Sequence, residues 1–120
     1  EFRRVLFRSP LWIIRGEEFI ETSPNPYSLG GYFPGIKKSF SDHKISIQTG
    51  DALYFFSDGF QDQFGGPQHK RYSVTRFREF IHRLAHQPVQ QQKLFLQNEF
   101  KMWKGNLPQN DDVLVVGIVV

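Results

Sequence analysis

Two continuous apolar runs stand out in the hydrophobic pattern of the chain. The first, Ala52–Phe56, leads directly into Ser57-Asp58-Gly59, and the second, residues 113–120, directly follows Asp111-Asp112. Runs of this length without polar alternation predict β-strands that are buried on both faces. Each predicted strand therefore has a carboxylate next to one of its ends, and the glycine after Asp58 is expected to let the chain turn.

Shorter patterns predict the other strands and the loops. Residues 11–14 and 18–22 have strand-like composition and are separated by residues 15–17, which predicts a β-hairpin. Residues 43–48 alternate polar and apolar side chains, as a half-exposed strand does. Residues 23–35 contain three prolines and three glycines, so we expect a loop there, and residues 61–70 predict a polar loop.

Two segments have the spacing of amphipathic helices. The first follows Ser73, a candidate N-cap, and extends to about His86. The second begins at Pro88, which suits a first helical turn, and ends at Gly105, a candidate C-cap. The order of elements indicates the α+β class, with two helices packed on a mostly antiparallel sheet. The predicted apolar stripes are Val74, Phe77, Phe80, Ile81 and Leu84 in the first helix and Val89, Leu96, Phe100 and Trp103 in the second.

The composition excludes several classes of protein. A chain of 120 residues is long enough for one domain with a hydrophobic core. It has no cysteine, which rules out disulfides and thiolate metal sites and fits a reducing cytoplasm, the location we expect. The longest apolar run, residues 113–120, is too short to cross a bilayer, so we expect no membrane contact in this segment.

The net charge of +3 depends on the first nine residues. Residues 1–9 resemble the translation of a sequencing-adapter oligonucleotide, and an amphipathic targeting peptide is the alternative interpretation. Without these nine, residues 10–120 carry 12 basic and 11 acidic side chains, so the basic character almost disappears. We therefore expect no nucleic-acid partner, and we assign residues 10–120 to the natural domain.

Asp58 and Asp111 are the candidate functional residues. Each alone is more often a turn residue or a solvated strand end. In an antiparallel sheet, however, the end of one strand lies beside the start of its neighbour, so the two aspartates could share one end of the sheet. Paired carboxylates repel unless a cation compensates them, and oxygen ligands favour Mg²⁺ or Mn²⁺ over Zn²⁺.

Four motifs carry a resemblance to a known family. The chain resembles the C-terminal half of bacterial SpoIIE-type phosphatases at residues 50–66, residues 70–72, residues 103–105 and Gln109-Asn110-Asp111-Asp112 with the apolar run after it. These belong to the PPM (protein phosphatase 2C-like) serine/threonine phosphatases. Residues 10–17 and residues 29–31 are similar to the preceding hairpin and glycine of that family.

The resemblance implies a fold and a mechanism. The fold is an αββα sandwich, of which this chain would hold a part. Two Mn²⁺ or Mg²⁺ ions bridge a water that attacks phosphoserine or phosphothreonine in a protein substrate. By motif, Asp58 and Asp111 match metal ligands, and Ser57, Gly59 and Asp112 match supporting positions.

The sequence departs from the family pattern in two ways. Leu114 stands where the family usually has threonine, and nothing in residues 10–57 matches the upstream Gly-Asp metal motif. We therefore expect a C-terminal piece that is inactive alone. Its parent would be a cytoplasmic bacterial signalling phosphatase with a sensor or regulatory domain upstream.

Two other functional classes stay open at this point. One is a non-catalytic interaction or regulatory module that retains the phosphatase fold, which the sequence upstream of the chain would distinguish. The other is a phosphoryl-transfer enzyme in which Asp58 is the nucleophile and a lysine lies nearby, which trapping of an acyl-phosphate would detect.

Three weaker candidate sites favour a structural interpretation. His82 and His86 have the spacing of a zinc site, but we expect them on a solvated surface. Residues 64–67 could cradle a phosphate in a backbone nest, but a glycine-rich turn is the preferred interpretation. The aromatic residues Phe77, Phe80 and Trp103 are expected in the core rather than in a base-stacking platform.

Overall fold

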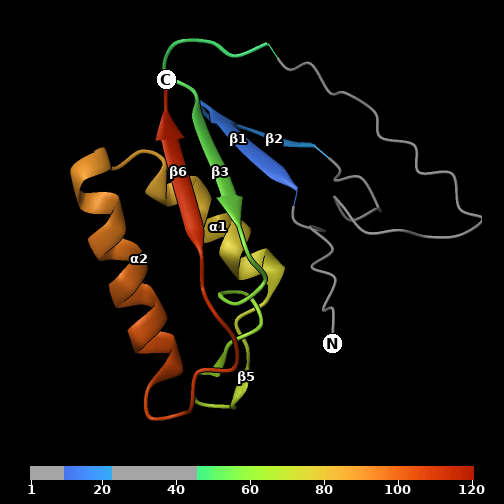
Figure 1. Ribbon diagram of the computed structural model, residues 1–120, viewed down its shortest axis with the longest axis vertical. Helices are drawn as coiled ribbons and strands as arrows, with labels where there is room; N and C mark the ends of the chain where they lie inside the picture. The colour runs from blue at the N-terminus through green and yellow to red at the C-terminus, as the bar shows by residue number, and fades with distance from the viewer. Residues whose placement is uncertain (1–9, 23–45) are drawn as a thin grey trace, which may run out of the picture.

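The computed structural model describes residues 10–22 and 46–120. Within them, four strands form an antiparallel sheet with the order β2-β1-β3-β6, and β4 and β5 form a small separate hairpin (Figure 1). The elements are β1 (Leu11–Arg15), β2 (Glu18–Thr22), β3 (Ala52–Phe56), β4 (Phe64–Gly65), β5 (Lys70–Arg71), α1 (Val74–Leu84), α2 (Val89–Lys104) and β6 (Val115–Val119). The predicted α+β class, with two helices and a mostly antiparallel sheet, is confirmed.

The predicted hairpin is present as β1 and β2. The two strands pair with Ile13 opposite Ile20, and a two-residue loop of Gly16 and Glu17 joins them. Gly16 has a φ of 57°, a conformation that glycine adopts without the steric cost that a Cβ atom imposes. The local sequence therefore determines both the turn and the register of this pair.

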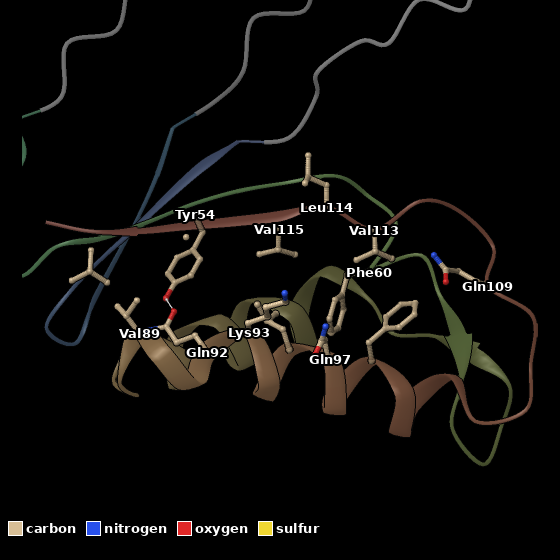
Figure 2. A pocket seen from close by; sticks show the side chains of 14 residues that line it. Tyr54, Phe60, Val89, Gln92, Lys93, Gln97, Gln109, Val113, Leu114 and Val115 are labelled. Atoms are coloured by element: carbon tan, nitrogen blue, oxygen red, sulfur yellow. Dashed lines mark hydrogen bonds between the residues drawn. The ribbon is translucent and has the colours of Figure 1, made fainter.

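Both helices pack on the same face of the sheet, as Figure 2 shows with the strands above the helices. Alternation along the strands directs Trp12 and Tyr54 toward this face, where they are 0% and 1% exposed. The Phe77 ring of α1 lies 5.4 Å from that of Trp12 and 5.1 Å from that of Phe56. Each buried aromatic side chain of this kind contributes roughly 1.5–3 kcal/mol. The predicted core residues Phe77 and Phe80 are buried, and Trp103 packs against the same cluster.

The helix ends agree with the sequence prediction to within two residues. The Ser73 hydroxyl accepts a hydrogen bond from the Arg76 amide and caps α1, and Gly105 closes α2 with a φ of 55°. The stripe predicted for α2 is wrong at its start, because Val89 is exposed and Gln92 is buried instead. Gln92 can be buried because its amide bonds the Tyr54 hydroxyl and the Gln87 carbonyl oxygen.

The prediction that both long strands are buried on two faces is wrong for β6, and in β3 it fails at Phe55, although Leu53 is buried. Phe55 of β3 is 47% exposed, and Val116 and Ile118 of β6 are 40% and 48% exposed. These three side chains point away from the helices, and within the described residues β6 is the edge strand of its sheet. The continuous apolar runs therefore indicate strands, but the helices cover only one face of them.

The strand predicted for residues 43–48 is absent from its described part, residues 46–48. There the backbone bonds to side chains rather than to a neighbouring strand: the Gln48 amide donates to Asp51, and Arg15 donates to the Ser46 carbonyl oxygen. The predicted loop at residues 61–70 contains the short strands β4 and β5. Residues 1–9, the loop 23–35 and residues 43–45 lie outside the described residues. Within those residues, no helix has the length and hydrophobicity that crossing a membrane requires.

Candidate functional site

The register of β3 and β6 brings two aspartate-bearing segments to one end of the sheet. The strands pair with Phe56 opposite Val115, so the last residue of β3 lies beside the first residue of β6. Asp58 follows Phe56 by two positions, and Asp111 precedes Val115 by four positions. Residues 57–59 and 111–114, which are far apart in sequence, therefore lie side by side beyond the strands (Figure 1).

Ser57 connects the two segments directly. Its hydroxyl donates to the Asp112 carbonyl oxygen at 3.1 Å and accepts from the Leu114 amide at 3.0 Å. The Ser57 amide in turn donates to the Leu114 carbonyl oxygen at 2.9 Å. These three bonds extend the contact between the strands past the regular ladder, and they hold the backbone of Asp112 next to the turn that carries Asp58.

Gly59 is needed for close approach rather than for the turn that the sequence suggested. Its φ lies outside the left-handed region that favours glycine. A Cβ atom at this position would lie 2.1 Å from the Asp112 carbonyl oxygen, closer than atoms can approach. The missing side chain therefore allows the Asp58 turn to pack directly on the backbone of the Asp112 segment.

The carboxylates of Asp58 and Asp111 are exposed to solvent. Asp58 Oδ1 accepts one bond from Gln61 Nε2 at 3.2 Å, and Asp111 Oδ1 accepts one from the Asp112 amide at 2.8 Å. Each carboxylate keeps a second oxygen to which no described residue donates. Such oxygen donors fit a hard cation such as Mg²⁺ or Mn²⁺, which takes about six ligands. Within residues 10–22 and 46–120, no three metal-ligating side chains cluster, so this part supplies only some of a complete shell.

Gln63 also links the two segments, and sequence reasoning gave it no role. Its side chain is fully buried, and its amide bonds the backbone of Phe64 beside it and of Pro108 and Asn110, just before Asp111. The Asn110 side chain makes the reciprocal contact, because its Oδ1 accepts from the Phe64 amide at 3.0 Å. No local pattern distinguishes Gln63 from the other polar residues of its loop, so only the tertiary contacts reveal it.

The glycines of residues 64–67 leave room for Trp103 to pack against this turn. A Cβ atom on Gly65 would lie 1.9 Å from the Trp103 carbonyl oxygen, and one on Gly66 would lie 2.7 Å from the Trp103 ring. The Gly66 amide donates to the Trp103 carbonyl oxygen, and Trp103 Nε1 donates to the Gln63 carbonyl oxygen. Because the Gly66 amide is already bonded, these contacts favour the turn interpretation over a phosphate nest.

His82 of α1 is half-buried, and His86, two residues after the helix ends, is exposed, as predicted for a surface position. One ring nitrogen of His82 lies 3.1 Å from the Glu17 carbonyl oxygen, and one of His86 lies 2.8 Å from the His82 carbonyl oxygen. The His82 contact ties α1 to the β1–β2 turn, and the Glu17 carboxylate lies 3.5 Å from His86 Nε2. Among the described residues, no three such side chains form a group that could hold a metal ion.

A cavity of about 510 Å³ lies between the sheet and α2 (Figure 2). The Tyr54 hydroxyl donates to Gln92 Oε1 at 2.8 Å at one end of it, and burial raises the pKa of Tyr54 to about 12. The lining reaches Gln109 and Val113, on either side of Asp111, but includes neither Asp58 nor Asp111. The candidate chemistry therefore lies at the carboxylates, outside this cavity.

Comparisons with known proteins agree with the fold. Residues 8–120 match the family described as Stage II sporulation protein E (SpoIIE). Among solved structures, the chain resembles the SiaA-PP2C domain of Pseudomonas aeruginosa with a TM-score of 0.79 and 23% identity, over 94% of this chain and 43% of that one. A comparison with curated proteins gave no significant match.

A second similar structure contains the PP2C phosphatase domain and a fragment of the regulatory domain of the cell fate determinant SpoIIE from Bacillus subtilis. The TM-score is 0.60 and the identity 19%, over 93% of this chain and 31% of that one. The two likenesses show that the chain has the fold of part of a PP2C phosphatase domain. The chain spans less than half the length of either structure.

Proposed function

The chain belongs to the SpoIIE family, and from this premise we propose that it is part of a metal-dependent protein phosphatase domain. The substrate class is phosphoserine or phosphothreonine in a protein. Asp58 and Asp111 act as ligands of Mn²⁺ or Mg²⁺, with two ions in the complete domain. The activity belongs to a longer domain, in which further residues complete the metal shell, so the chain is inactive alone.

The observation that carries this proposal is the pairing of β3 with β6. Phe56 lies opposite Val115, and the Ser57 hydroxyl bonds the backbone at Asp112 and Leu114. Two exposed carboxylates on bonded, neighbouring segments make the arrangement that a divalent cation favours.

In this mechanism, the residues of this chain would bind the metal ions and hold the metal-binding carboxylates in position. The carboxylates of Asp58 and Asp111 donate oxygen ligands from the ends of two paired strands, so their positions follow the rigid sheet. Ser57, Gly59 and Asp112 support them, because the Ser57 hydroxyl and the close packing of Gly59 hold the Asp112 backbone in place. When bound, Mn²⁺ or Mg²⁺ supplies Lewis acidity, which lowers the pKa of a water ligand and neutralises phosphoryl oxygens.

The biological setting follows the family in the same proposal. We infer a bacterial signalling protein in the cytoplasm, whose phosphatase activity is controlled by a sensor or regulatory domain. The similar SpoIIE structure from Bacillus subtilis includes a fragment of a regulatory domain, which motivates this inference. The partners are then the phosphorylated protein substrate and that regulatory domain.

Mn²⁺ titration of the longer protein, followed by electron paramagnetic resonance, tests the metal assignment. We expect Asp58→Asn and Asp111→Asn each to weaken Mn²⁺ binding by more than about tenfold. The matched control is Glu18→Gln, an exposed carboxylate at the opposite end of the sheet, which leaves binding unchanged. In the longer protein, the same aspartate variants should abolish Mn²⁺-dependent release of phosphate from a phosphoserine peptide.

Three results would contradict the proposal. If the Asp58→Asn variant of the longer protein released phosphate at the wild-type rate, Asp58 would be excluded as a metal ligand. A longer protein that binds no Mn²⁺ and releases no phosphate would instead favour the alternative, a non-catalytic interaction or regulatory module with this fold. An acyl-phosphate trapped on Asp58 would favour the aspartate-nucleophile alternative.

A further inference from the structure

The side chain of Gln63 is buried between the two segments that carry Asp58 and Asp111. It is 0% exposed, although glutamine is usually a surface residue. We propose that Gln63 is a positioning residue that holds residues 108–112 against the Asp58 turn and so fixes the spacing of the two carboxylates. This inference rests on the proposed metal site, but the contact it describes exists without metal.

Both polar atoms of the Gln63 side chain make hydrogen bonds. Nε2 donates to the Phe64 and Pro108 carbonyl oxygens, both at 2.9 Å, and Oε1 accepts from the Asn110 amide at 3.1 Å. Gln63, which follows Asp58 by five positions, thus bonds two backbone groups of the segment that carries Asp111. These partners set the orientation of the amide, because two carbonyl oxygens require the NH₂ group and one N–H requires the oxygen.

The hydrogen bonds of Ser57 and Gln63 join the two segments on both sides of each aspartate in the sequence. Asp58 lies between Ser57 and Gln63 in the sequence, and Asp111 lies between Asn110 and Asp112. Ser57 bonds the Asp112 carbonyl oxygen, and Gln63 bonds the Asn110 amide. Both neighbours of Asp111 are therefore bonded to the segment that carries Asp58, so the two segments cannot shift independently.

The backbone of Gln63 is fixed as well. Its carbonyl oxygen accepts from Trp103 Nε1 at 2.8 Å and from the Tyr72 amide at 2.9 Å. Trp103 belongs to α2 and Tyr72 lies just before α1, so Gln63 links the Asp58 turn to the helical layer. A residue anchored in this way can transmit the rigidity of the core to the exposed carboxylates.

The test compares Gln63→Met with Gln92→Met in this chain. Both glutamines are buried and hydrogen-bonded, but Gln92 bonds Tyr54 and Gln87 instead of the aspartate segments. Methionine keeps the length and apolar volume and removes the amide, so both variants lose a buried polar network. Hydrogen exchange is measured on each variant of this chain without metal. Mn²⁺ affinity is measured by electron paramagnetic resonance on the same variants of the longer protein.

The positioning role predicts a difference between the two variants. In Gln63→Met, amide exchange across residues 109–114 should rise by about tenfold or more, and the Mn²⁺ dissociation constant should rise by about tenfold. In Gln92→Met, the amide exchange of residues 109–114 and the Mn²⁺ dissociation constant should stay within about twofold of wild type. This should hold even if the midpoint of unfolding falls as much as it does in Gln63→Met. Equal changes in the two variants would overturn the proposal, because they would reflect general destabilisation.

The two proposals fail in distinguishable ways. A wild-type longer protein that binds no Mn²⁺ would contradict the metal site, while the exchange of residues 109–114 in this chain would still decide whether Gln63 holds the segment. Wild-type Mn²⁺ binding that is unchanged in Gln63→Met would overturn the positioning role and leave the metal site intact.

A second variant covers the case in which Gln63→Met does not fold. Asn110→Ala removes the acceptor for the Phe64 amide at an exposed position and leaves the core untouched. It should raise exchange in residues 109–114 and weaken Mn²⁺ binding in the same direction as Gln63→Met. Unchanged exchange and affinity in a folded Asn110→Ala protein would show that a hydrogen bond between these segments can be lost without releasing residues 109–114, and would overturn the proposal that such bonds fix their spacing.

Discussion

The two ends of β3 carry the same pair of residues in opposite order. Gly50 and Asp51 precede the strand, and Asp58 and Gly59 follow it. Asp51 is 1% exposed, and it accepts hydrogen bonds from Arg15 Nε at 3.0 Å, from Arg15 Nη2 at 2.9 Å and from the Gln48 amide. Asp58 is exposed and accepts one side-chain bond, from Gln61.

This difference separates a structural carboxylate from a candidate ligand. The Arg15 guanidinium and the Gln48 amide hold the pKa of Asp51 below its ordinary value, so its charge is satisfied within the fold. The bonds of Asp51 also close the turn before β3, where the Asp51 carbonyl oxygen accepts from the Val120 amide. Asp58 lacks a cationic partner among the described residues, which leaves its charge available to a cation.

The two glycines differ in the same way. Gly50 has a φ of 95° and no atom within 4 Å of the position that a Cβ would take. Gly59 has an ordinary φ, but its missing Cβ makes room for the Asp112 carbonyl oxygen. One end of β3 therefore needs glycine for its backbone conformation, and the other end needs it for contact between two segments.

The largest loss of stability should come from Asp51→Asn. This change leaves the Arg15 guanidinium without its charged partner, and charges in buried or half-buried pairs depend on that partner. Because folding lowers the pKa of Asp51 below 3.8, its ionised form stabilises the fold above that pH. The contribution is lost as the pH falls through the lower folded-state value.

Urea unfolding at neutral pH and at acidic pH measures this effect. The gap in free energy of unfolding between wild type and Asp51→Asn should be wide at neutral pH and should narrow on acidification. A gap that does not depend on pH would contradict the role assigned to the Asp51 charge.

Gly59→Ala should have the next largest effect. The added methyl group meets the Asp112 carbonyl oxygen, and overpacking of this kind costs roughly 1–3 kcal/mol. Mn²⁺ binding should weaken as well, because the Asp112 segment must move away from Asp58. Chemical denaturation and Mn²⁺ titration measure the two effects.

Gly50→Ala is the matched control at the other end of β3. It should cost about 1–2 kcal/mol through its left-handed backbone alone. Because the Gly50 position is open, Mn²⁺ binding should be unaffected. Equal effects of the two substitutions on Mn²⁺ binding would remove the distinction between the two ends.

The smallest effect on stability should come from Asp58→Asn. The side chain is exposed and makes one weak bond, so the free energy of unfolding should change by less than about 0.5 kcal/mol. Differential scanning calorimetry without metal measures it, beside the loss of Mn²⁺ binding already expected for this variant. A loss as large as that of Asp51→Asn would show that Asp58 is a structural residue.

Most elements of the fold could be predicted because their signals are local. The β1–β2 hairpin follows from a short turn at Gly16, and α1 follows from a capping serine and helical spacing. The small β4–β5 hairpin was missed, because its strands have only two residues each and lie in a polar segment. Burial was overestimated for Val116 and Ile118, since an apolar run does not reveal which face the helices cover.

The candidate site was predictable only in part. Asp58 and Asp111 stand next to apolar runs within recognisable motifs, so they could be selected from the sequence, and their role as ligands stays a prediction. Gln63 and Asn110 could not be selected, because their importance lies in bonds to backbone groups more than forty positions away.

The sequence by itself determined the main strands and both helices, the α+β class and the two aspartates, because periodicity, capping residues and motif spacing are properties of neighbouring residues. Only the tertiary structure decided that Asp51 pairs with Arg15, while Asp58 has no cationic partner among the described residues. It also decided that Gly59 packs on Asp112 and that Gln63 joins the two segments. These outcomes depend on which backbone groups meet after folding, and such contacts leave no local pattern in the chain.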